Sequence, residues 1–278
     1  MVARVTRAPS TPQVIPFDLL PSCNLSVDAV YEGGRYSAQS KGTANEPLSK
    51  LLPGVSNSSG FRIPGGHKNP KFVVLYSSGR DLDWPDDLDV YTGRFDYYGD
   101  NKRPGSGLHD TGKKGNFLLK SVFDRIHSVE PDYSKIPPFF VFFRYPTSGS
   151  GSSVQFKGLA VPGYPSVSSS DDLVAIWRSK DGQRFQNYRA VFTILDDQEI
   201  SRDWLTELSE NGPPALQNAP NAWRSWVEGR NYRPLKAPPT KTIRSAQDQV
   251  PVNKQQEDIV FAIYEHFRST PTAFEPFA

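Results

Sequence analysis

The sequence is poor in cysteine and in long hydrophobic runs. Cys23 is the only cysteine among 278 residues. One thiol can build neither a disulfide framework nor a zinc site of several cysteines. No run of about 18 apolar residues occurs, and the first thirty residues lack the apolar centre of a signal peptide. We therefore expect a cytoplasmic protein without membrane spans, whose fold rests on its core rather than on cross-links.

An excess of charge of one sign is also missing. Lys and Arg number 32 and Asp and Glu 30, for a net charge of +2, so a nucleic-acid site would have to be a local patch. One candidate runs from Trp223 to Lys254, where seven basic residues stand against two acidic ones. This cluster suits phosphate contacts, and a solvated linker would explain it equally well.

Short apolar runs separated by Gly and Pro dominate the chain, which holds 21 Gly and 25 Pro. This pattern is typical of strands and loops rather than long helices. It predicts an α+β fold with a curved, barrel-like, mostly antiparallel sheet and flanking helices. Strands are expected near 25–31, 72–76, 137–145, 154–161, 172–178 and 188–195, with one more that ends at 91–93. Helices are expected near 46–52, 115–127, 202–208, 223–226 and 257–268.

Changes in composition divide the chain into four expected regions. Residues 1–24 are predicted to be a loose arm, and 25–200 a strand-rich domain. Residues 201–252 are predicted to be a helical and basic extension packed on that domain. Residues 253–278 contain an amphipathic helix and then an apolar stretch where the sequence stops, which is typical of the beginning of a further domain.

The central stretch 73–116 concentrates the residues that carry chemistry. Acidic and aromatic side chains occupy 81–91, and cations with Asn follow at 101–114. A site that holds a nucleobase needs a carboxylate for its amino group and rings for its faces. A site that holds a nucleic-acid backbone needs cations. Both sets occur within one stretch of about 40 residues.

Three phrases in this stretch carry a resemblance: Val73-Val74-Leu75, Tyr91-Thr92-Gly93 and Asp100-Asn101-Lys102-Arg103. They resemble the core of SRA domains, which flip 5-methylcytosine out of duplex DNA. Over about 25–250 the chain also resembles the N-terminal recognition region of AspBHI-type modification-dependent restriction endonucleases. The wider match rests on Gly60-Phe61-Arg62, residues 75–100, Leu108-His109-Asp110-Thr111, residues 158–163 and residues 184–190.

The resemblance implies an SRA/PUA-like sheet that binds double-stranded DNA at a modified cytosine by base flipping. It implies that this region needs no cofactor. Mg²⁺ would serve only a nuclease domain that lies mostly outside the sequence and begins within 253–278. Self-association would then run through that missing region.

The resemblance also implies roles for individual residues in a modified-base pocket. Tyr91 would stack on the base, with Trp84 or Tyr76 on the other face. At the family's spacing before Tyr91 stands Leu82, flanked by Asp81 and Asp83, so either carboxylate could accept the bond from cytosine N4. The alternative is that the two acids cap the loop backbone and that Tyr91 is an ordinary strand residue.

A second group of residues is expected on the DNA itself. Asn101, Lys102 and Arg103 match the finger that SRA domains insert into the duplex, although a solvated turn has the same composition. Lys113 and Lys114 suit phosphates. His109 and Arg62 lie in neighbouring loops and complete the predicted DNA-binding set.

Two other functions remain open at this point. Pro85-Asp86 followed by Asp100-Asn101-Lys102 fits the PD-(D/E)xK nuclease spacing, in which two carboxylates hold Mg²⁺ and Lys assists the attacking water. An unrelated β-barrel that binds a small ligand is the second. The residues do not distinguish 5-methylcytosine from bulkier modifications, Asp81 from Asp83, or one oligomeric state from another.

Overall fold

The structure is a computed structural model, and it describes residues 11–34, 45–56 and 60–238. Residues up to Ala237 form one compact unit. The expectations for 1–10 and for the part of the basic cluster after residue 238 lie outside the described residues. So do those for the helix near 257–268 and the remainder of 253–278.

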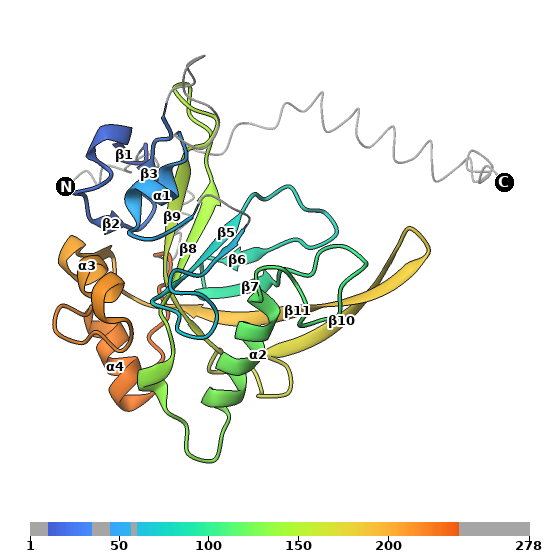
Figure 1. Cartoon of the computed structure of the whole chain (residues 1–278). Coiled ribbons are helices and arrows are strands. Elements are labelled where there is room, and N and C mark those ends of the chain that lie inside the picture. The colour runs from blue at the N-terminus through green and yellow to red at the C-terminus, as the bar shows by residue number, and fades with distance from the viewer. Residues whose placement is uncertain (1–10, 35–44, 57–59, 239–278) are drawn as a thin grey trace, which may run out of the picture. The chain divides into compact units, whose positions relative to one another are not determined.

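A ten-stranded sheet is the centre of the unit (Figure 1). Its path runs β4 (Phe61–Arg62), β5 (Val73–Ser77), β8 (Phe139–Arg144), β9 (Val154–Pro162), β11 (Gln183–Ile194), β7 (Arg94–Tyr98) and β6 (Asp87–Asp89). Off this path, β3 (Val30–Tyr31) pairs with β9, β1 (Val14–Ile15) with β3, and β10 (Leu173–Lys180) with β11. A separate pair joins β2 (Leu25–Ser26) to β12 (Glu199–Ile200).

Most of these pairs are antiparallel, as the spacing of the runs predicted. Among the described strands, β5–β8 and β1–β3 are parallel. The path from β4 to β6 does not close on itself in the described part of the chain. The α+β class and the mostly antiparallel sheet are confirmed, and the curvature stops short of a closed barrel.

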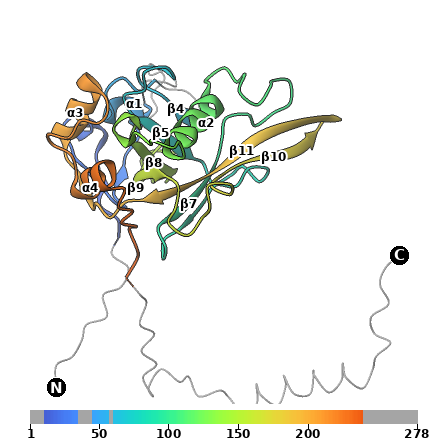
Figure 2. The same cartoon turned by 90° about the horizontal axis from the view of Figure 1, so that it is seen from below.

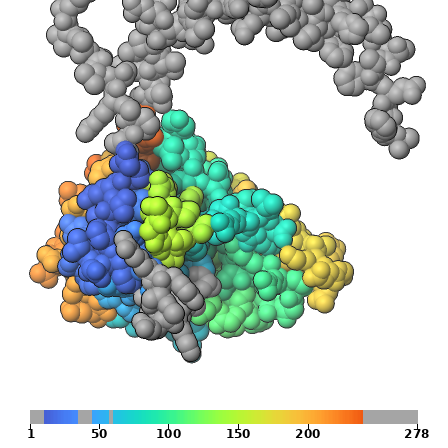
Figure 3. Space-filling model, turned by 90° about the horizontal axis from the view of Figure 1, so that it is seen from above, coloured from blue at the N-terminus to red at the C-terminus, as the bar shows by residue number. Residues whose placement is uncertain are grey.

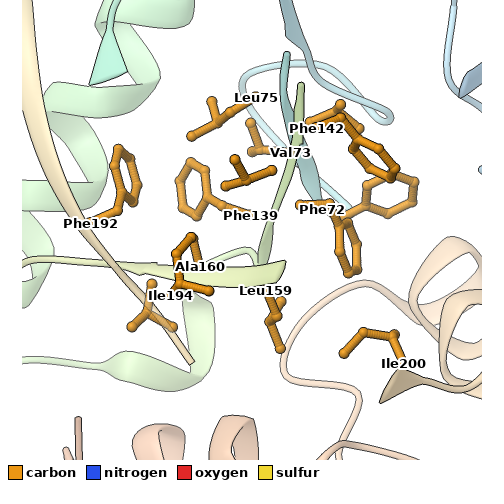
Figure 4. Close-up of a cluster of buried hydrophobic side chains, with 14 of the residues drawn as sticks. Phe72, Val73, Leu75, Phe139, Phe142, Leu159, Ala160, Phe192, Ile194 and Ile200 are labelled. Atoms are coloured by element: carbon orange, nitrogen blue, oxygen red, sulfur yellow. The ribbon is translucent and has the colours of Figure 1, made fainter. Parts of the chain in front are cut away.

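Strand β8 explains why the core has two sides. Phe139 packs on Phe192 at 4.9 Å between ring centroids, whereas its neighbour Phe140 packs on Trp204 at 6.0 Å. Successive side chains of a strand point to opposite faces, so both faces of β8 are buried. Figure 4 shows Phe139 and Phe192 in one cluster and Phe142 beside Phe72 in another. This burial accounts for the unbroken apolar run of the strand.

Helices cover both faces of the sheet (Figure 1). On one side lies α2 (Gly115–Ile126), and the ring centroid of its Phe123 is 5.8 Å from that of Phe192. On the other lie α3 (Arg202–Asn211) and α4 (Asn221–Gly229). The remaining described helices are the short α1 (Pro47–Leu51), η1 (Phe17–Leu19) and η2 (Tyr133–Lys135). The apolar face predicted for α2 is confirmed, since its core-facing side chains are buried: Leu118, Leu119, Val122, Phe123 and Ile126.

The extension after residue 200 shares the same core. Ser201 caps α3 by accepting a hydrogen bond from the Trp204 backbone N–H at 3.2 Å, as the sequence predicted. Trp204 is 0% exposed and donates from its indole N–H to the Ala215 carbonyl at 2.7 Å. The ring centroids of Trp204 and Trp223 lie 5.8 Å apart, and Trp226 packs on Trp223. The three tryptophans are core residues, as large rings usually are.

Three local expectations differ from the structure. The strand expected at 25–31 is two short strands, because the backbone of Asp28 is left-handed (φ 62°). Residues 91–93 form a turn between β6 and β7 and do not end a strand. Asp89 accepts hydrogen bonds from the Tyr91 N–H and the Thr92 hydroxyl, which stabilises this turn. In the arm expected at 1–24, β1 pairs with β3, which ties its described part to the sheet.

No helix in the described ranges is long and apolar enough to span a bilayer.

We expect Trp204→Ala to lower the free energy of unfolding by about 3–5 kcal/mol, because it removes a buried ring and leaves a cavity. Trp177→Ala is the matched control: Trp177 is 55% exposed, and its loss should cost less than about 0.5 kcal/mol. Urea denaturation followed by circular dichroism measures both. Similar losses for the two variants would contradict the assignment of Trp204 to the shared core.

Candidate nucleic-acid interface

A cavity of about 590 Å³ opens where the sheet fails to close. Its walls come from β4 and β5 at one end of the sheet path, from β7 near the other, and from the loop that leads to α2. Its volume lies within the range of small-molecule sites. It is lined by Gly60, Phe61, Arg62, Tyr76, Ser78, Asp86, Tyr97, Gly99, Asp100, Asn101, Lys102, Arg103, Pro104, Ser106, Thr111 and Gly112.

Asp86 supplies a carboxylate to this cavity from the residue just before β6. Its Oδ1 accepts a hydrogen bond from the Tyr98 backbone N–H at 2.9 Å, which fixes the orientation of the carboxyl group. Burial raises the pKa of Asp86 above its ordinary value, against the opposing effects of that N–H and of the Lys102 ammonium. An oriented, partly desolvated carboxylate is a strong acceptor for an amino group.

Two tyrosine rings stand on the same cavity. Tyr97 is 1% exposed and packs 6.0 Å from Phe61, and burial raises the pKa of its phenol far above the ordinary value. Tyr76 is half-buried at the end of β5, and burial raises the pKa of its phenol as well. Both phenols are therefore neutral at physiological pH. The half-buried Tyr76 keeps part of its ring accessible from the cavity, whereas Tyr97 is a buried part of the wall.

Two of the three cations that line the cavity form ion pairs with carboxylates. Arg62, 6% exposed, forms an ion pair with Glu46 at 2.7 Å, and its guanidinium lies 5.9 Å from the Tyr76 ring centre. Lys102 forms an ion pair with Asp81 at 3.1 Å. Arg103, which follows, is exposed at the rim. The wall is thus polar without carrying a large net charge.

A buried amide network holds the loop between β7 and α2 against the sheet. Asn187, 0% exposed on β11, accepts from the Asn101 N–H at 3.2 Å and from the Asn116 side chain at 3.0 Å. Asn187 also donates to the Gly99 carbonyl at 3.0 Å. A Cβ on Gly99 would overlap Asn116 Oδ1, so this position requires glycine. These bonds fix the part of the loop that lines the cavity.

Asn101, which the sequence placed in a DNA-inserted finger, is a member of that network. It is 3% exposed, and its side-chain amide donates to the carbonyls of Gln186 at 2.8 Å and Ser106 at 3.3 Å. Lys102 and Arg103 line the cavity beside it. Of the sequence-predicted residues, the structure brings Arg62, Tyr76, Asn101, Lys102 and Arg103 together on this cavity.

The other predicted pocket residues lie outside the cavity. Tyr91 is 62% exposed on the β6–β7 turn, and Trp84 is 1% exposed, packed between Tyr98 and Phe185. Asp83 pairs with Lys180 at 3.1 Å. The pattern of residues could not show that Tyr91 lies on an exposed turn and not on the cavity.

The remaining predicted DNA contacts lie along the loop into α2. His109 Nε2 and the Tyr188 hydroxyl are 2.9 Å apart. Lys114 donates to the His109 carbonyl at 3.1 Å and forms an ion pair with Asp110 at 3.3 Å. Lys113 is exposed next to it. These residues border the same loop without lining the cavity.

The β10–β11 hairpin is a surface that the motif analysis missed. It projects beyond the loops around the cavity (Figure 2). Asp181 and Gly182 both have positive φ, which matches the tight turn at its tip. Near the tip, the Arg184 guanidinium lies 5.0 Å from the Trp177 ring centre, and Trp177 is 55% exposed. An exposed ring among arginines on a hairpin is the signal that could have identified this surface.

Sequence reasoning also overlooked Tyr97 and gave Asp86 a different role. The sequence suggested Asp86 only as a metal-binding carboxylate of the nuclease spacing. It gave no role to Tyr97, which is one of several aromatic residues after the Tyr-Thr-Gly phrase. Strand alternation in β7 could have indicated that Tyr97 is buried, because Phe95 and Tyr97 share one face. The position of Asp86 depends on β6 pairing with β7, which spacing alone did not predict.

Asp86, Asp100 and Lys102, the three residues of the nuclease spacing, do line one cavity. Asp100, however, binds the start of α2: its two oxygens accept from the Gly115 and Asn116 N–H groups at 2.9 and 2.8 Å. This geometry is a helix N-terminal cap rather than an open metal ligand. Among the described residues, no three His, Cys, Asp or Glu side chains gather as a metal site.

Comparison with known proteins places the chain among DNA-recognition domains. A family model described as restriction endonuclease AspBHI N-terminal matches residues 25–238. The DNA recognition domain of the cytosine modification-dependent restriction endonuclease LpnPI is 43% identical, with a TM-score of 0.76, over 84% of this chain and 100% of that one. The DNA modification-dependent restriction endonuclease AspBHI is 42% identical, with a TM-score of 0.72, over 81% and 100%.

A third solved structure, the MspJI restriction endonuclease in complex with a 27-mer oligonucleotide, is 19% identical with a TM-score of 0.57. The match covers 88% of this chain and 61% of that one. At this identity the likeness concerns the fold alone. No curated protein sequence matches the chain.

The raised pKa of Asp86 predicts that Asp86→Asn stabilises the protein at neutral pH. Between the ordinary Asp pKa of about 3.9 and its value in the folded protein, Asp86 binds more protons folded than unfolded. Wild-type stability therefore falls as pH rises through this window. Asn does not titrate, so the melting temperature of Asp86→Asn should exceed that of the wild type by on the order of 2 °C at pH 7.

The comparison is made by differential scanning calorimetry between pH 3 and pH 7. The difference in melting temperature should shrink as the pH is lowered through the window, because Asp86 then becomes neutral in the wild type as well. A difference that stays the same at every pH would contradict a desolvated Asp86.

Proposed function

The chain belongs to the family of restriction endonuclease AspBHI N-terminal domains, and we propose that it binds duplex DNA at a modified cytosine and holds that base, flipped out of the duplex, in the cavity. One observation carries the proposal: a carboxylate and two tyrosine rings line a single cavity of about 590 Å³. Its relatives LpnPI and AspBHI, 42–43% identical, are modification-dependent restriction endonucleases, which supports the assignment.

Asp86 would recognise the pairing edge of the flipped base. Cytosine presents its N4 amino group as a donor, and the ionised Asp86 would accept a hydrogen bond from it. The half-buried ring of Tyr76 would contact a face of the base, and the Tyr97 ring, 1% exposed, would form part of the cavity wall behind it. Stacking on an aromatic ring is worth about 1–3 kcal/mol per base, which helps offset the few kcal/mol needed to unstack a base.

The 5-methyl group would contribute less than the rest of the base. One buried methyl group is worth about 0.8 kcal/mol, or about a fourfold preference over cytosine. A stronger preference would require a clash, an ordered water or contacts with the flanking bases. The proposal therefore covers 5-methylcytosine and related modifications without choosing among them.

Two surfaces next to the cavity would hold the DNA backbone. Lys102 and Arg103 lie on the rim, with Lys113 and Lys114 further along the same loop. The β10–β11 hairpin adds Arg178, Lys180 and Arg184, with Trp177 exposed among them. Figure 3 shows the hairpin surface, in yellow, beside the turquoise and green surface of these loops. Arg178 and Lys180 share one face of the hairpin, over the loop of Trp84 and Asp83, and Arg184 lies with Trp177 on the other face. Local clusters of this kind are what an overall charge of +2 requires of a DNA-binding surface.

The motif and the geometry assign the base pocket differently. The motif favours Tyr91 with Asp81 or Asp83 and Trp84, whereas the cavity favours Tyr76 and Tyr97 with Asp86. We propose the second set, because Tyr91 is exposed outside the cavity and both Asp81 and Asp83 are paired with lysines.

The role of the chain within a larger protein is also a proposal. Residues 25–238 would form the recognition part in the cytoplasm, where restriction acts on incoming DNA. Cleavage with Mg²⁺ and self-association would lie outside this recognition part.

Asp86→Asn should weaken binding to a duplex with one modified cytosine by about 10- to 100-fold, the loss of one charge-assisted hydrogen bond. Asp87→Asn is the matched control, because it removes the same charge from the next residue, which is exposed on β6. Fluorescence anisotropy with matched duplexes that differ at a single cytosine measures the effect.

Tyr91→Ala and Asp81→Asn separate the two assignments in the same assay. Under the cavity assignment, Tyr91→Ala and Asp81→Asn both keep the preference for modified DNA. Loss of the preference in Tyr91→Ala, with Asp86→Asn unaffected, would favour the motif assignment instead. A wild-type chain that binds no duplex at all would favour a small-ligand barrel, and Mg²⁺-dependent scission by this chain would favour a nuclease.

The hairpin should contribute affinity without selectivity. Arg178→Ala together with Arg184→Ala should weaken modified and unmodified duplexes alike and lower the slope of log K against log salt by about one for each lost phosphate contact. Lys135→Ala on η2, 68% exposed, is the control cation and should leave the slope unchanged. An unchanged slope in the hairpin variant would exclude this surface.

A further inference from the structure

Leu82 is exposed at the tip of the loop between β5 and β6. Its side chain is 91% exposed, although leucine is among the residues that proteins most often bury. A single exposed leucine needs no explanation by itself. What distinguishes Leu82 is how its loop is held and where that loop lies.

The residues on both sides of Leu82 are anchored. Asp81 accepts a hydrogen bond from the Trp84 N–H at 3.2 Å and forms the 3.1 Å ion pair with Lys102. Asp83 forms the 3.1 Å ion pair with Lys180 at the hairpin. Trp84 is 1% exposed and packs on Phe185. Leu82 therefore stands on a braced loop and not on a loosely tethered one.

The loop connects the two surfaces proposed to hold DNA. Through Lys102 it meets the rim of the cavity, and through Lys180 it meets the β10–β11 hairpin. Four residues after Leu82, Asp86 lines the cavity itself. Each of the two flanking carboxylates is paired with a lysine, so the tip can approach a phosphate backbone with little net repulsion.

We infer that Leu82 is the apolar wedge that enters the base stack when the modified cytosine leaves it. This inference rests on the proposed function. An apolar side chain inserted at a base step replaces part of the lost stacking and shields the opened step from water. The flipped base and the wedge would then be held by one loop, since Leu82 lies at its tip and Asp86 at the end that leads into β6.

A duplex in which the modified cytosine is already unpaired tests this role. Leu82→Ala should weaken binding to a fully paired modified duplex by about tenfold. It should weaken binding by less than about twofold when the cytosine faces an abasic site, because opening that site needs little further unstacking. Leu82→Met should restore binding, since methionine keeps an apolar side chain of similar reach.

Val129→Ala is the matched control, because Val129 is 101% exposed on the loop after α2, and it should bind like the wild type. A 2-aminopurine next to the modified cytosine should brighten on binding wild-type protein and less on binding saturating Leu82→Ala. Equal binding by Leu82→Ala and wild type on the paired duplex, or equal losses on both duplexes, would overturn the wedge role of Leu82 and leave the proposed function standing. A wild-type chain without preference for modified over unmodified duplex would overturn the proposed function, and the wedge with it.

Discussion

The burial of β8 on both faces is the constraint from which the rest of the unit follows. Phe139 and Phe140 point to opposite sides of the sheet, and each meets a ring from a different layer. One side therefore needs α2 as a cover and the other needs α3 and α4. With its centre filled in this way, the sheet curves without closing, and the opening between its two ends becomes the cavity. The site is a consequence of how the core is packed.

The polar groups around the opening are expensive to bury and are kept in place by many bonds. Arg62 and Glu46 form an ion pair with little exposure on either partner, and such a pair costs more when broken than it contributes when intact. The amide network of Asn101, Asn116 and Asn187 is fully inside the protein, where an unmade hydrogen bond would be costly. Asp86 keeps a carboxylate where burial disfavours its charge. We interpret this cost as the price of a preorganised acceptor.

The electrostatics of the chain are local. An overall charge of +2 gives no general attraction to DNA, so we propose that the hairpin and the loops beside the cavity orient the DNA. The acidic loop 81–86 supplies one carboxylate to the cavity and uses two others to hold Lys102 and Lys180. An acidic loop can therefore belong to a DNA-binding surface when its charges are matched by fixed cations.

The sequence by itself determined the fold class, the long strands, helix α2 and the cap of α3, because these depend on periodicity and short-range hydrogen bonds. It also indicated the family, which the comparisons support. The tertiary structure decided which residues share the cavity. The turn that Asp89 stabilises leaves Tyr91 exposed outside the cavity. The Asn101 side chain is held inside the protein by the Gln186 carbonyl, 85 residues away. Pairing between distant strands has no local signature, so only the folded chain reveals these neighbours.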